Sequence, residues 1–216
     1  MYNLVVEIGV LIIFTGASGA GKDSVMDEFL KNPLVQKFNL KKVVTCTDRP
    51  PRPGETDGIQ YHFVSSAQLQ KMAKDDELVE PITKYGTSNK ATPKIEIERL
   101  LAGENLVWRI DPSRAAEVAS GKFFQRIFPE KVHLLQDHTI VLFVTAPKEV
   151  ITERRKIRDL DKYDPAEYKV RDDQDQIYLD ILQKKATLIE NLDSRLDETV
   201  DLAVKFAVDT YDKIKN

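Results

Sequence analysis

Nine residues close to the N-terminus, Gly16 to Ser24, read GASGAGKDS and could bind a phosphate group. Three glycines and a lysine in so short a run let backbone N–H groups wrap around an anion. Gly16, Gly21 and Lys22 fit the P-loop pattern G-x-x-x-x-G-K-[ST], except at its last position. The pattern asks there for a Ser or Thr that binds Mg²⁺, whereas this chain has Asp23.

The segments on either side of this loop are those that a P-loop needs. Residues 10–15 form a short aliphatic run, which is typical of a strand buried on both faces. Residues 22–30 have helical spacing, and Asn32-Pro33 ends that helix. The loop amides and the helix dipole would face the β-phosphate, and Lys22 would bridge the β- and γ-phosphates of ATP. The predicted ATP-binding residues are Ala17, Ser18, Gly19, Ala20, Gly21, Lys22, Asp23 and Ser24.

A proline-rich segment, TDRPPRPGE at residues 47–55, is a second candidate phosphate site. Arg49 and Arg52 lie three residues apart in it, and the prolines stiffen the backbone between them. Two guanidinium forks held in this way suit bidentate binding of a phosphate. Glu55 adds an acceptor and Tyr61 a hydroxyl group. From these residues alone, an exposed loop with solvated arginines is an equally good interpretation.

Extended and helical segments alternate along the rest of the chain. Extended segments are expected at 42–45, 61–64, 77–80, 105–110, 139–144 and 188–191. Helices are expected at 67–74, 93–101, 112–119, 148–158, 167–185 and 196–214, and Thr92 is expected to cap the helix at 93–101. This alternation predicts an α/β protein with a parallel sheet.

The composition is that of an ordinary globular protein, with 42% hydrophobic and 31% charged residues among 216. A net charge of −3 gives no general electrostatic reason to bind nucleic acid or an anionic membrane. The single cysteine, Cys46, fits a reducing compartment. No apolar run approaches the roughly 18 residues of a membrane span. The three histidines lack the spacing of metal ligands. We therefore expect a cytoplasmic protein that binds neither nucleic acid nor a membrane.

Residues 47–55, followed by Gly58 and Tyr61-His62-Phe63-Val64, resemble the monophosphate site of guanylate kinases, S-x-T-T-R-x-P-R-P-G-E-x-x-G-x-x-Y-x-F-V. Leu78-Val79-Glu80 and Tyr85-Gly86-Thr87-Ser88 resemble two further segments of that family. The resemblance implies a P-loop NTPase three-layer fold with a parallel central sheet, an inserted monophosphate-binding region and a short lid. It also implies one domain over 1–216, with its core at 1–45, 105–150 and 186–216, the monophosphate-binding region at 46–104 and the lid at about 154–171.

The implied reaction is transfer of a phosphoryl group from ATP to GMP or dGMP, with Mg²⁺, in a monomer or homodimer. Thr45 and Glu80 would read the guanine, because a carboxylate can accept from N1–H and the 2-amino group together, whereas adenine would leave it unpaired. The implied GMP-binding residues are Thr45, Arg49, Arg52, Glu55, Tyr61, Glu80, Tyr85, Thr87 and Asp111. The implied catalytic residues are Lys22, Arg49, Arg158 and Arg171, with Arg154 as a substitute, and Asn191 would contact adenine.

The chain departs from the family pattern at several places. Asp23 replaces the Mg²⁺-binding hydroxyl, Asp48 replaces the second Thr of T-T-R, and Arg109 stands where the first Asp of L-D-x-D is usual. The segment 80–85 is shorter than usual, and 122–136 is an insertion. We expect the carboxylate of Asp23 to take the place of the hydroxyl on Mg²⁺, directly or through water.

Two alternatives remain open. Gly-Lys-Asp-Ser also resembles ribose 1,5-bisphosphate phosphokinases, which are relatives that phosphorylate a sugar phosphate. A non-catalytic guanylate-kinase-like module that binds phosphorylated peptides is the other alternative. The Gly21-Lys22 pair and the lid arginines argue against it, and Asp23 leaves it open.

Overall fold

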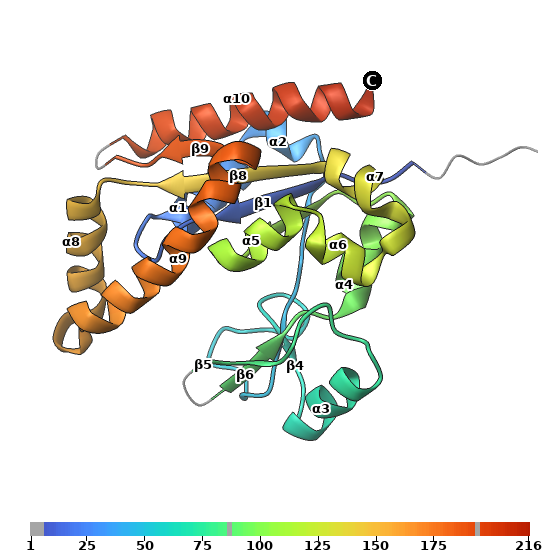
Figure 1. Ribbon diagram of the computed structural model, residues 1–216, viewed down its shortest axis with the longest axis horizontal. Coiled ribbons are helices and arrows are strands. Elements are labelled where there is room, and N and C mark those ends of the chain that lie inside the picture. Colours follow the sequence, from blue (N-terminus) through green and yellow to red (C-terminus); the bar gives the residue numbers. More distant parts are fainter. Residues whose placement is uncertain (1–6, 86–87, 193–194) are drawn as a thin grey trace, which may run out of the picture. The chain divides into compact units, whose positions relative to one another are not determined.

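The computed structural model describes residues 7–85, 88–192 and 195–216, with the backbone alone at Tyr85 and Gln174 (Figure 1). The described chain forms two compact units. The smaller unit comprises residues 7–9 and 41–106, and the larger unit comprises residues 10–40 and 107–216. The expected single domain over 1–216 and its internal boundaries stay a prediction.

A five-stranded sheet has the strand order β2-β7-β1-β8-β9. Its strands are β2 (Lys41–Lys42), β7 (Leu106–Arg109), β1 (Leu11–Thr15), β8 (Thr139–Thr145) and β9 (Thr187–Glu190). β1 pairs in parallel with β8, where Leu11 lies opposite Thr139, and β8 pairs in parallel with β9. The predicted α/β fold with a parallel central sheet is therefore confirmed.

Helices cover both faces of this sheet (Figure 1). One face carries α1 (Lys22–Lys31), α2 (Pro33–Gln36) and α10 (Leu196–Lys215), and the other carries α5 (Pro112–Ala119) and α9 (Pro165–Lys185). Ile12 and Phe14 of β1 belong to the core on the α1–α10 side, together with Phe29. All five residues of β1 are buried, as expected for a strand covered on both faces.

The remaining helices of the larger unit include the predicted insertion. That segment folds as α6 (Lys122–Ile127), the 3₁₀ turn η2 (Pro129–Lys131) and α7 (Val132–Asp137). Phe123 of α6 is fully buried, and its ring lies 5.6 Å from that of Trp108 between centroids. α8 (Lys148–Asp159) and the turn η3 (Leu160–Lys162) then lead into α9.

The smaller unit contains a four-stranded sheet with the order β4-β3-β6-β5. Its elements are β3 (Cys46–Thr47), β4 (His62–Phe63), β5 (Thr83–Tyr85), β6 (Ser88–Ala91), α3 (Ser66–Lys74), α4 (Lys94–Glu98) and the turn η1 (Arg99–Ala102). A capping box between Ser65 and Gln68 begins α3. A small core of Cys46, Leu69, Leu78 and Ala91 holds the helix against the sheet.

Three local expectations were wrong. The strand expected at 42–45 is split, because β2 ends at Lys42 and β3 begins at Cys46. Residues 77–80 are not a strand: Leu78 forms an isolated bridge with Pro93, whose nitrogen has no hydrogen to donate. Thr92 does not cap α4, which has Pro93 at its N-cap and no side-chain cap bond. Thr92 instead bonds within the smaller unit, as described below.

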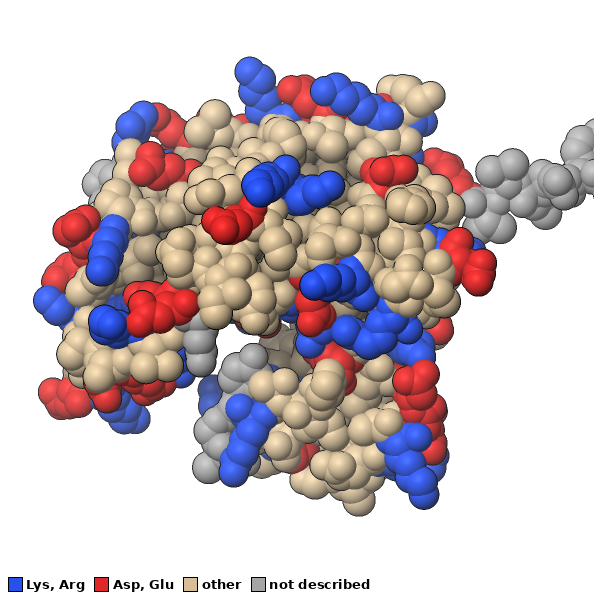
Figure 2. Space-filling model, in the orientation of Figure 1, with Lys and Arg blue, Asp and Glu red and all other residues tan. Residues whose placement is uncertain are grey.

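The described helices include none that is both long and apolar enough to cross a lipid bilayer. On the face drawn in Figure 2, acidic and basic side chains are interspersed over α10 and over α8 and α9. This mixture agrees with the small net charge of the chain.

Candidate active site

The glycine-rich loop connects β1 to α1 inside the larger unit. Gly16 and Gly21 have φ angles of 149° and 84°. A Cβ atom at Gly16 would lie 2.1 Å from the carbonyl oxygen of Val144, and one at Gly21 would lie 2.2 Å from Nδ2 of Asn191. Both positions therefore require glycine. Gly21 caps α1 without a side-chain bond, so the first amides of the helix face the place where an anion would lie.

Lys22 lies within this loop rather than in open solvent. Its Nζ donates to the carbonyl oxygen of Ala17 at 3.4 Å. Burial lowers the pKa of Lys22, Asp23 opposes that shift, and Arg109 lowers the pKa further. A desolvated ammonium group beside other cations gains from the arrival of an anion. This environment suits the predicted role of Lys22 in binding phosphates.

Three arginines of α8 contact the backbone or side chains of the loop. Arg154 donates to the carbonyl oxygen of Ala20 at 3.2 Å, and Arg155 donates to that of Ser18 at 2.7 Å. Arg158 donates to Oγ of Ser18 at 3.3 Å. The structure thus brings the predicted Arg158, and its predicted substitute Arg154, to the loop.

Arg155 is a residue that the sequence did not single out. It is only 3% exposed, forms bonds of 2.9 and 2.6 Å to the two carboxylate oxygens of Asp172, and lies 4.3 Å from the ring centroid of Tyr168. Arg155 therefore ties the loop and α8 to α9. Within the run ERRKIR its buried position could not be recognised, because neighbouring arginines differ only in which side of the helix they occupy.

Arg171, the other predicted lid arginine, has its contacts on its own helix. Its Nη2 donates to Glu167 at 2.5 Å, and its guanidinium group lies 5.6 Å from the ring centroid of Tyr168. A role in phosphoryl transfer for Arg171 stays a prediction, and it requires this side chain to leave Glu167.

Asn191, the predicted adenine contact, supports the loop. Its Nδ2 donates to the carbonyl oxygen of Ala20 at 2.8 Å, and its backbone N–H donates to Thr145 at 2.7 Å. The residue is 4% exposed and directly follows β9. These contacts show that Asn191 helps to hold the glycine-rich loop in its conformation. Its contact with adenine stays a prediction.

Two of the departures from the family pattern meet in one ion pair. Nη1 of Arg109 lies 2.5 Å from Oδ1 of Asp23. Arg109 ends β7, and the N–H of the next residue, Ile110, donates to Phe14 of β1 at 3.1 Å. This register places the end of β7 beside the strand that leads into the loop. Asp23 lies in the first turn of α1.

The residues around Asp23 do not fit a magnesium ion held by the protein at that carboxylate. One of its oxygens is already bonded to a guanidinium group, which would repel a second cation at the same place. The described residues also contain no group of three or more His, Cys, Asp or Glu side chains arranged to hold a metal. Mg²⁺ that ATP carries on its own phosphates needs no such group. The ion pair with Arg109 therefore argues against the role expected for Asp23 as a ligand of Mg²⁺.

Asp111, predicted to line the GMP site, caps α5 in the larger unit. Its Oδ1 accepts from the backbone N–H of Arg114 at 3.1 Å. Asp111 also acts on Asp175 of α9: burial raises the pKa of Asp175 to about 6, and the charges of Asp111 and Asp172 raise it in the same direction. Lys22 and Arg155 oppose this shift. The negative charge near Lys22 therefore depends on pH in the mildly acidic range.

In the smaller unit, Glu55 holds the predicted phosphate-binding segment in shape. Its carboxylate accepts hydrogen bonds from both terminal nitrogens of Arg49 at 2.6 Å each, and from the backbone N–H of Arg52 at 2.7 Å. The bonds from Arg49, followed by that from Arg52, lower the pKa of Glu55 to about 2. The guanidinium group of Arg49 lies 5.2 Å from the ring centroid of Tyr61. Glu55 thus positions the arginines rather than facing outward as an acceptor.

Lys90 of β6 is a second residue that the sequence did not single out. Its Nζ donates to the hydroxyl oxygen of Tyr61 at 2.7 Å and lies 4.5 Å from the ring centroid. Arg49 and Lys90 therefore place two positive charges around Tyr61. Only the antiparallel pairing of β6 with β3, in which Lys90 lies opposite Thr47, brings Lys90 to this place.

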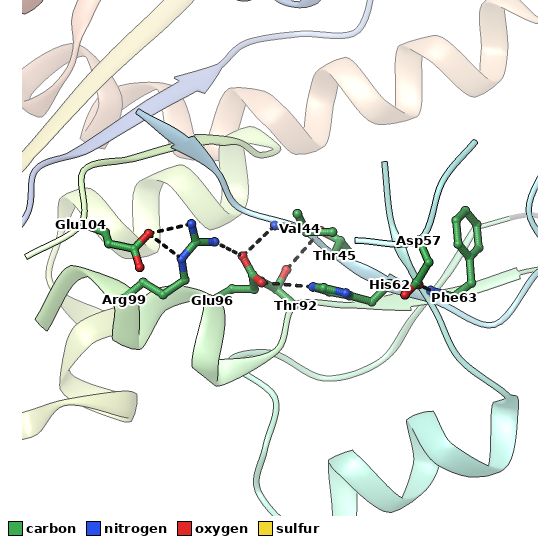
Figure 3. Close-up of polar contacts among 9 residues, drawn as sticks. All are labelled: Val44, Thr45, Asp57, His62, Phe63, Thr92, Glu96, Arg99 and Glu104. Carbon is green, nitrogen blue, oxygen red and sulfur yellow. Dashed lines mark hydrogen bonds and ion pairs between the residues drawn. The ribbon is translucent and has the colours of Figure 1, made fainter. Parts of the chain in front are cut away.

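The two predicted guanine-reading residues meet through Thr92. Oε1 of Glu80 accepts from the N–H of Thr92 at 3.1 Å and from its hydroxyl at 2.8 Å. The hydroxyl oxygens of Thr92 and Thr45 lie 3.4 Å apart (Figure 3). One carboxylate oxygen of Glu80 is thus fixed by Thr92, which the sequence had suggested only as a helix cap.

A buried carboxylate supports this part of the smaller unit (Figure 3). Glu96 is 7% exposed and accepts from the N–H of Val44 at 3.1 Å and from Arg99 at 2.8 Å. Nε2 of His62 lies 3.1 Å from its other oxygen. Glu96 therefore fixes the backbone directly before Thr45.

Asp48, another departure from the family pattern, connects three elements. It accepts from the N–H and the side-chain amide of Asn89 at 2.7 and 2.6 Å, and from the hydroxyl of Ser66 at 2.7 Å. The backbone bond of Asn89 is the largest cause that lowers the pKa of Asp48 to about 2, followed by Ser66. Asp48, which stands where the family pattern has Thr, thus joins the end of β3 to β6 and α3. The predicted roles of the Tyr85 side chain and of Thr87 lie outside the described residues.

A glycine-rich loop between the first strand and first helix of a parallel α/β sheet defines a P-loop nucleotide-binding protein. The family model for guanylate kinase matches residues 9–125. A guanylate kinase of Carboxydothermus hydrogenoformans is 31% identical over 156 residues, which are 71% of this chain and 67% of that protein. The chain belongs to the guanylate kinase family, and the resemblance in its motifs is confirmed.

Other relatives match over shorter parts of their length. A guanylate kinase of Mycoplasma mycoides subsp. mycoides is 38% identical over 110 residues, 51% of this chain and 36% of that protein. The chain thus spans about a third of one relative and two thirds of the other. The crystal structure of a guanylate kinase from Anaplasma phagocytophilum has a similar fold, with a TM-score of 0.58 and 20% identity over 93% of this chain and 85% of that one.

Proposed function

We propose that the protein transfers the terminal phosphoryl group of ATP to GMP or dGMP, giving ADP and GDP or dGDP. The observation that supports this most strongly is that Glu80 is fixed by Thr92 beside Thr45, in a chain that also keeps Gly21-Lys22. A carboxylate held in this way suits a base that presents two adjacent donors, as guanine does. Membership of the guanylate kinase family supports the same assignment.

On the ATP side, the loop amides and Lys22 bind the β- and γ-phosphates. Mg²⁺ enters as part of the Mg–ATP substrate. Arg158, which contacts Ser18 of the loop, neutralises charge on the group that is transferred, with Arg154 beside it. The chemistry is in-line displacement without a covalent enzyme intermediate, so positioning and electrostatics supply the catalysis. Closure of the lid formed by α8 and the start of α9 excludes water.

On the acceptor side, Arg49, Arg52 and Tyr61 bind the phosphate of GMP, and Lys90 adds a further charge next to Tyr61. Glu55 keeps Arg49 oriented before the substrate arrives, which lowers the entropic cost of binding. Glu80 and Thr45 read the guanine edge. Cytoplasmic location, a monomer or homodimer, and the absence of nucleic acid and membrane partners stay predictions.

An acceptor screen tests this proposal. Purified protein with Mg–ATP is given AMP, CMP, UMP, GMP, dGMP or ribose 1,5-bisphosphate, and formation of ADP is measured. We expect turnover with GMP and dGMP. Turnover of ribose 1,5-bisphosphate alone would favour the sugar-phosphate kinase that the Gly-Lys-Asp-Ser sequence also resembles. Binding of phosphorylated peptides without turnover of any acceptor would favour the non-catalytic module.

A further inference from the structure

The ion pair between Asp23 and Arg109 joins two positions at which the chain departs from the family pattern. Asp23 stands where the P-loop pattern has a hydroxyl group that binds Mg²⁺, and Arg109, at the end of β7, stands where an Asp is usual. A hydroxyl and a carboxylate together carry one negative charge at neutral pH, whereas Asp23 and Arg109 together carry none. The protein surface at the end of the loop is therefore one unit less negative than the pattern implies. That difference favours direct contact with phosphate.

The pair is accessible to a ligand. The side chain of Arg109 is 47% exposed and that of Asp23 is 59% exposed. Arg109 bonds Asp23 through Nη1. A guanidinium group has five N–H donors, so one arginine can keep a carboxylate partner and bind a phosphate with its other nitrogens. Asp23 and Arg109 come from α1 and β7, two elements fixed by the sheet, so their geometry does not depend on a loose chain segment.

The charges around Arg109 are also suited to an anion. Arg109 lowers the pKa of Lys22, and Arg158 from α8 acts in the same direction, so both guanidinium groups lie close enough to repel the ammonium group of Lys22. Asp23 and Asp175 of α9 oppose this repulsion. A polyphosphate that binds between these cations relieves it.

We propose that Arg109 binds the phosphates of ATP directly and that Asp23 is the positioning residue that orients Arg109, so that ATP binding depends little on Mg²⁺. The inference rests on the proposed function for its ligand, ATP. It reverses the role expected for Asp23 from the sequence, because Asp23 acts on an arginine and not on the metal. Arg109 thereby performs at the ATP phosphates part of the charge neutralisation that Mg²⁺ otherwise supplies.

Equilibrium binding of ATP, in Mg²⁺ and in EDTA, tests the inference without any turnover. For the unaltered protein we expect dissociation constants within about threefold of each other, because charge-assisted bonds from Arg109 compensate for the missing metal. Arg109→Ala should weaken binding of metal-free ATP about tenfold or more, as expected for loss of a hydrogen bond to a charged group. Asp23→Ala should weaken it by a smaller factor, and Asp23→Asn, which keeps an acceptor oxygen, should recover most of that loss.

The double variant Asp23→Ser/Arg109→Asp restores the usual pattern. In this variant we expect ATP binding to become dependent on Mg²⁺ by about tenfold or more. A matched control is Glu28→Ser/Lys31→Asp, which makes the same charge changes in an exposed pair at the other end of α1 and should leave both dissociation constants unchanged. Thermal melting of each variant checks folding.

The inference is overturned if Arg109→Ala binds metal-free ATP as well as the unaltered protein does, or if EDTA alone weakens ATP binding more than about tenfold in the unaltered protein. Its failure is distinct from failure of the proposed function. A protein that binds metal-free ATP through Arg109 and phosphorylates neither GMP nor dGMP would retain the inference and lose the proposed function. Turnover of GMP by the unaltered protein, together with unchanged ATP binding in Arg109→Ala, would support the proposed function and overturn the inference.

Discussion

At the scale of single residues, Glu80 illustrates how a carboxylate can be fixed and still read a base. Thr92 supplies two donors to Oε1, and the side chain is only partly buried. Glu80→Gln can keep the contacts with Thr92 through its amide oxygen, but it places the donating NH₂ group of the amide where guanine also presents donors. We expect the KM for GMP to rise about 10- to 100-fold, with little change in the KM for ATP, in steady-state kinetics.

Glu77→Gln is the control for this experiment, because Glu77 is exposed and lies three residues before Glu80. It should leave both KM values unchanged. Equal changes in the KM values for GMP and ATP with Glu80→Gln would contradict the role of Glu80 as the base reader.

Lys90 gives a second prediction at this scale. Removing its charge in Lys90→Ala leaves Tyr61 in place but takes away the cation bonded to its hydroxyl. We expect the KM for GMP to rise about tenfold without a comparable change for ATP, because one charge-assisted contact to the monophosphate is lost. Lys84→Ala, at an exposed position on the neighbouring strand β5, serves as the control. An unchanged KM for GMP in Lys90→Ala would exclude Lys90 from the acceptor site.

The residues that the sequence revealed are those whose meaning lies in local spacing. Lys22 follows Gly21 at the start of a helix, and Arg49 stands among fixed prolines, so their chemistry can be predicted without a fold. Lys90, Thr92 and Arg155 were missed for one physical reason. Each acquires its role from a partner on another element, namely Tyr61, Glu80 and Asp172. The pairing of Asp23 with Arg109, 86 residues apart, was hidden in the same way.

At the scale of elements, the same distinction holds. The strand β1 and the helix α5 were predictable, because an apolar run and a Pro-initiated helix with a capping Asp are local signals. The structure of segment 77–80 was not predictable in this way. Leu78 forms only an isolated bridge with Pro93, the N–H of Val79 donates to Thr92, and the backbone bends at Val79 and Glu80. A strand needs a continuous partner, and Pro93 interrupts that partner.

The packing of α9 beside α5 leads to a prediction about pH. Burial, together with the charges of Asp111 and Asp172, raises the pKa of Asp175 of α9 to about 6, above the ordinary value of 3.8 for an aspartate. A raised acid pKa means that the folded state binds the proton more tightly. The contribution of Asp175 to stability is therefore greatest below about pH 4 and is lost as pH rises through about 6.

Asp175→Asn removes this penalty. After allowance for screening by solvent, we expect the variant to be more stable than the unaltered protein at pH 7.5 by about 1 kcal/mol, or roughly 2–4 °C in Tm. The difference should shrink as pH falls through about 6 and vanish near pH 4. Thermal melting between pH 4 and 8 measures it. Asp173→Asn, an exposed change on the same helix, should show no such trend, and an Asp175→Asn difference that stays constant with pH would refute the assignment.

At the scale of the whole molecule, the two compact units carry different predicted chemistry. The larger unit holds the P-loop and the α8 arginines, and the smaller unit holds the Arg49–Glu55 pair and the Glu80–Thr92–Thr45 group. If the division is functional, one unit can be disabled while the other still binds its substrate. Lys22 and Arg49 are suitable probes, because each is the principal cation of its predicted phosphate site.

Lys22→Ala should lower kcat by about a thousandfold or more, since the ammonium group that stabilises the transferring phosphates is lost. The dissociation constant for GMP, measured by calorimetry, should change by less than about twofold, because Lys22 makes no contact that GMP would use. Arg49→Ala should do the opposite to binding: GMP affinity should fall about tenfold or more, and ATP affinity should remain. If Lys22→Ala weakens GMP binding as strongly as Arg49→Ala does, the two sites are not separable in this way, and binding of the two nucleotides is coupled.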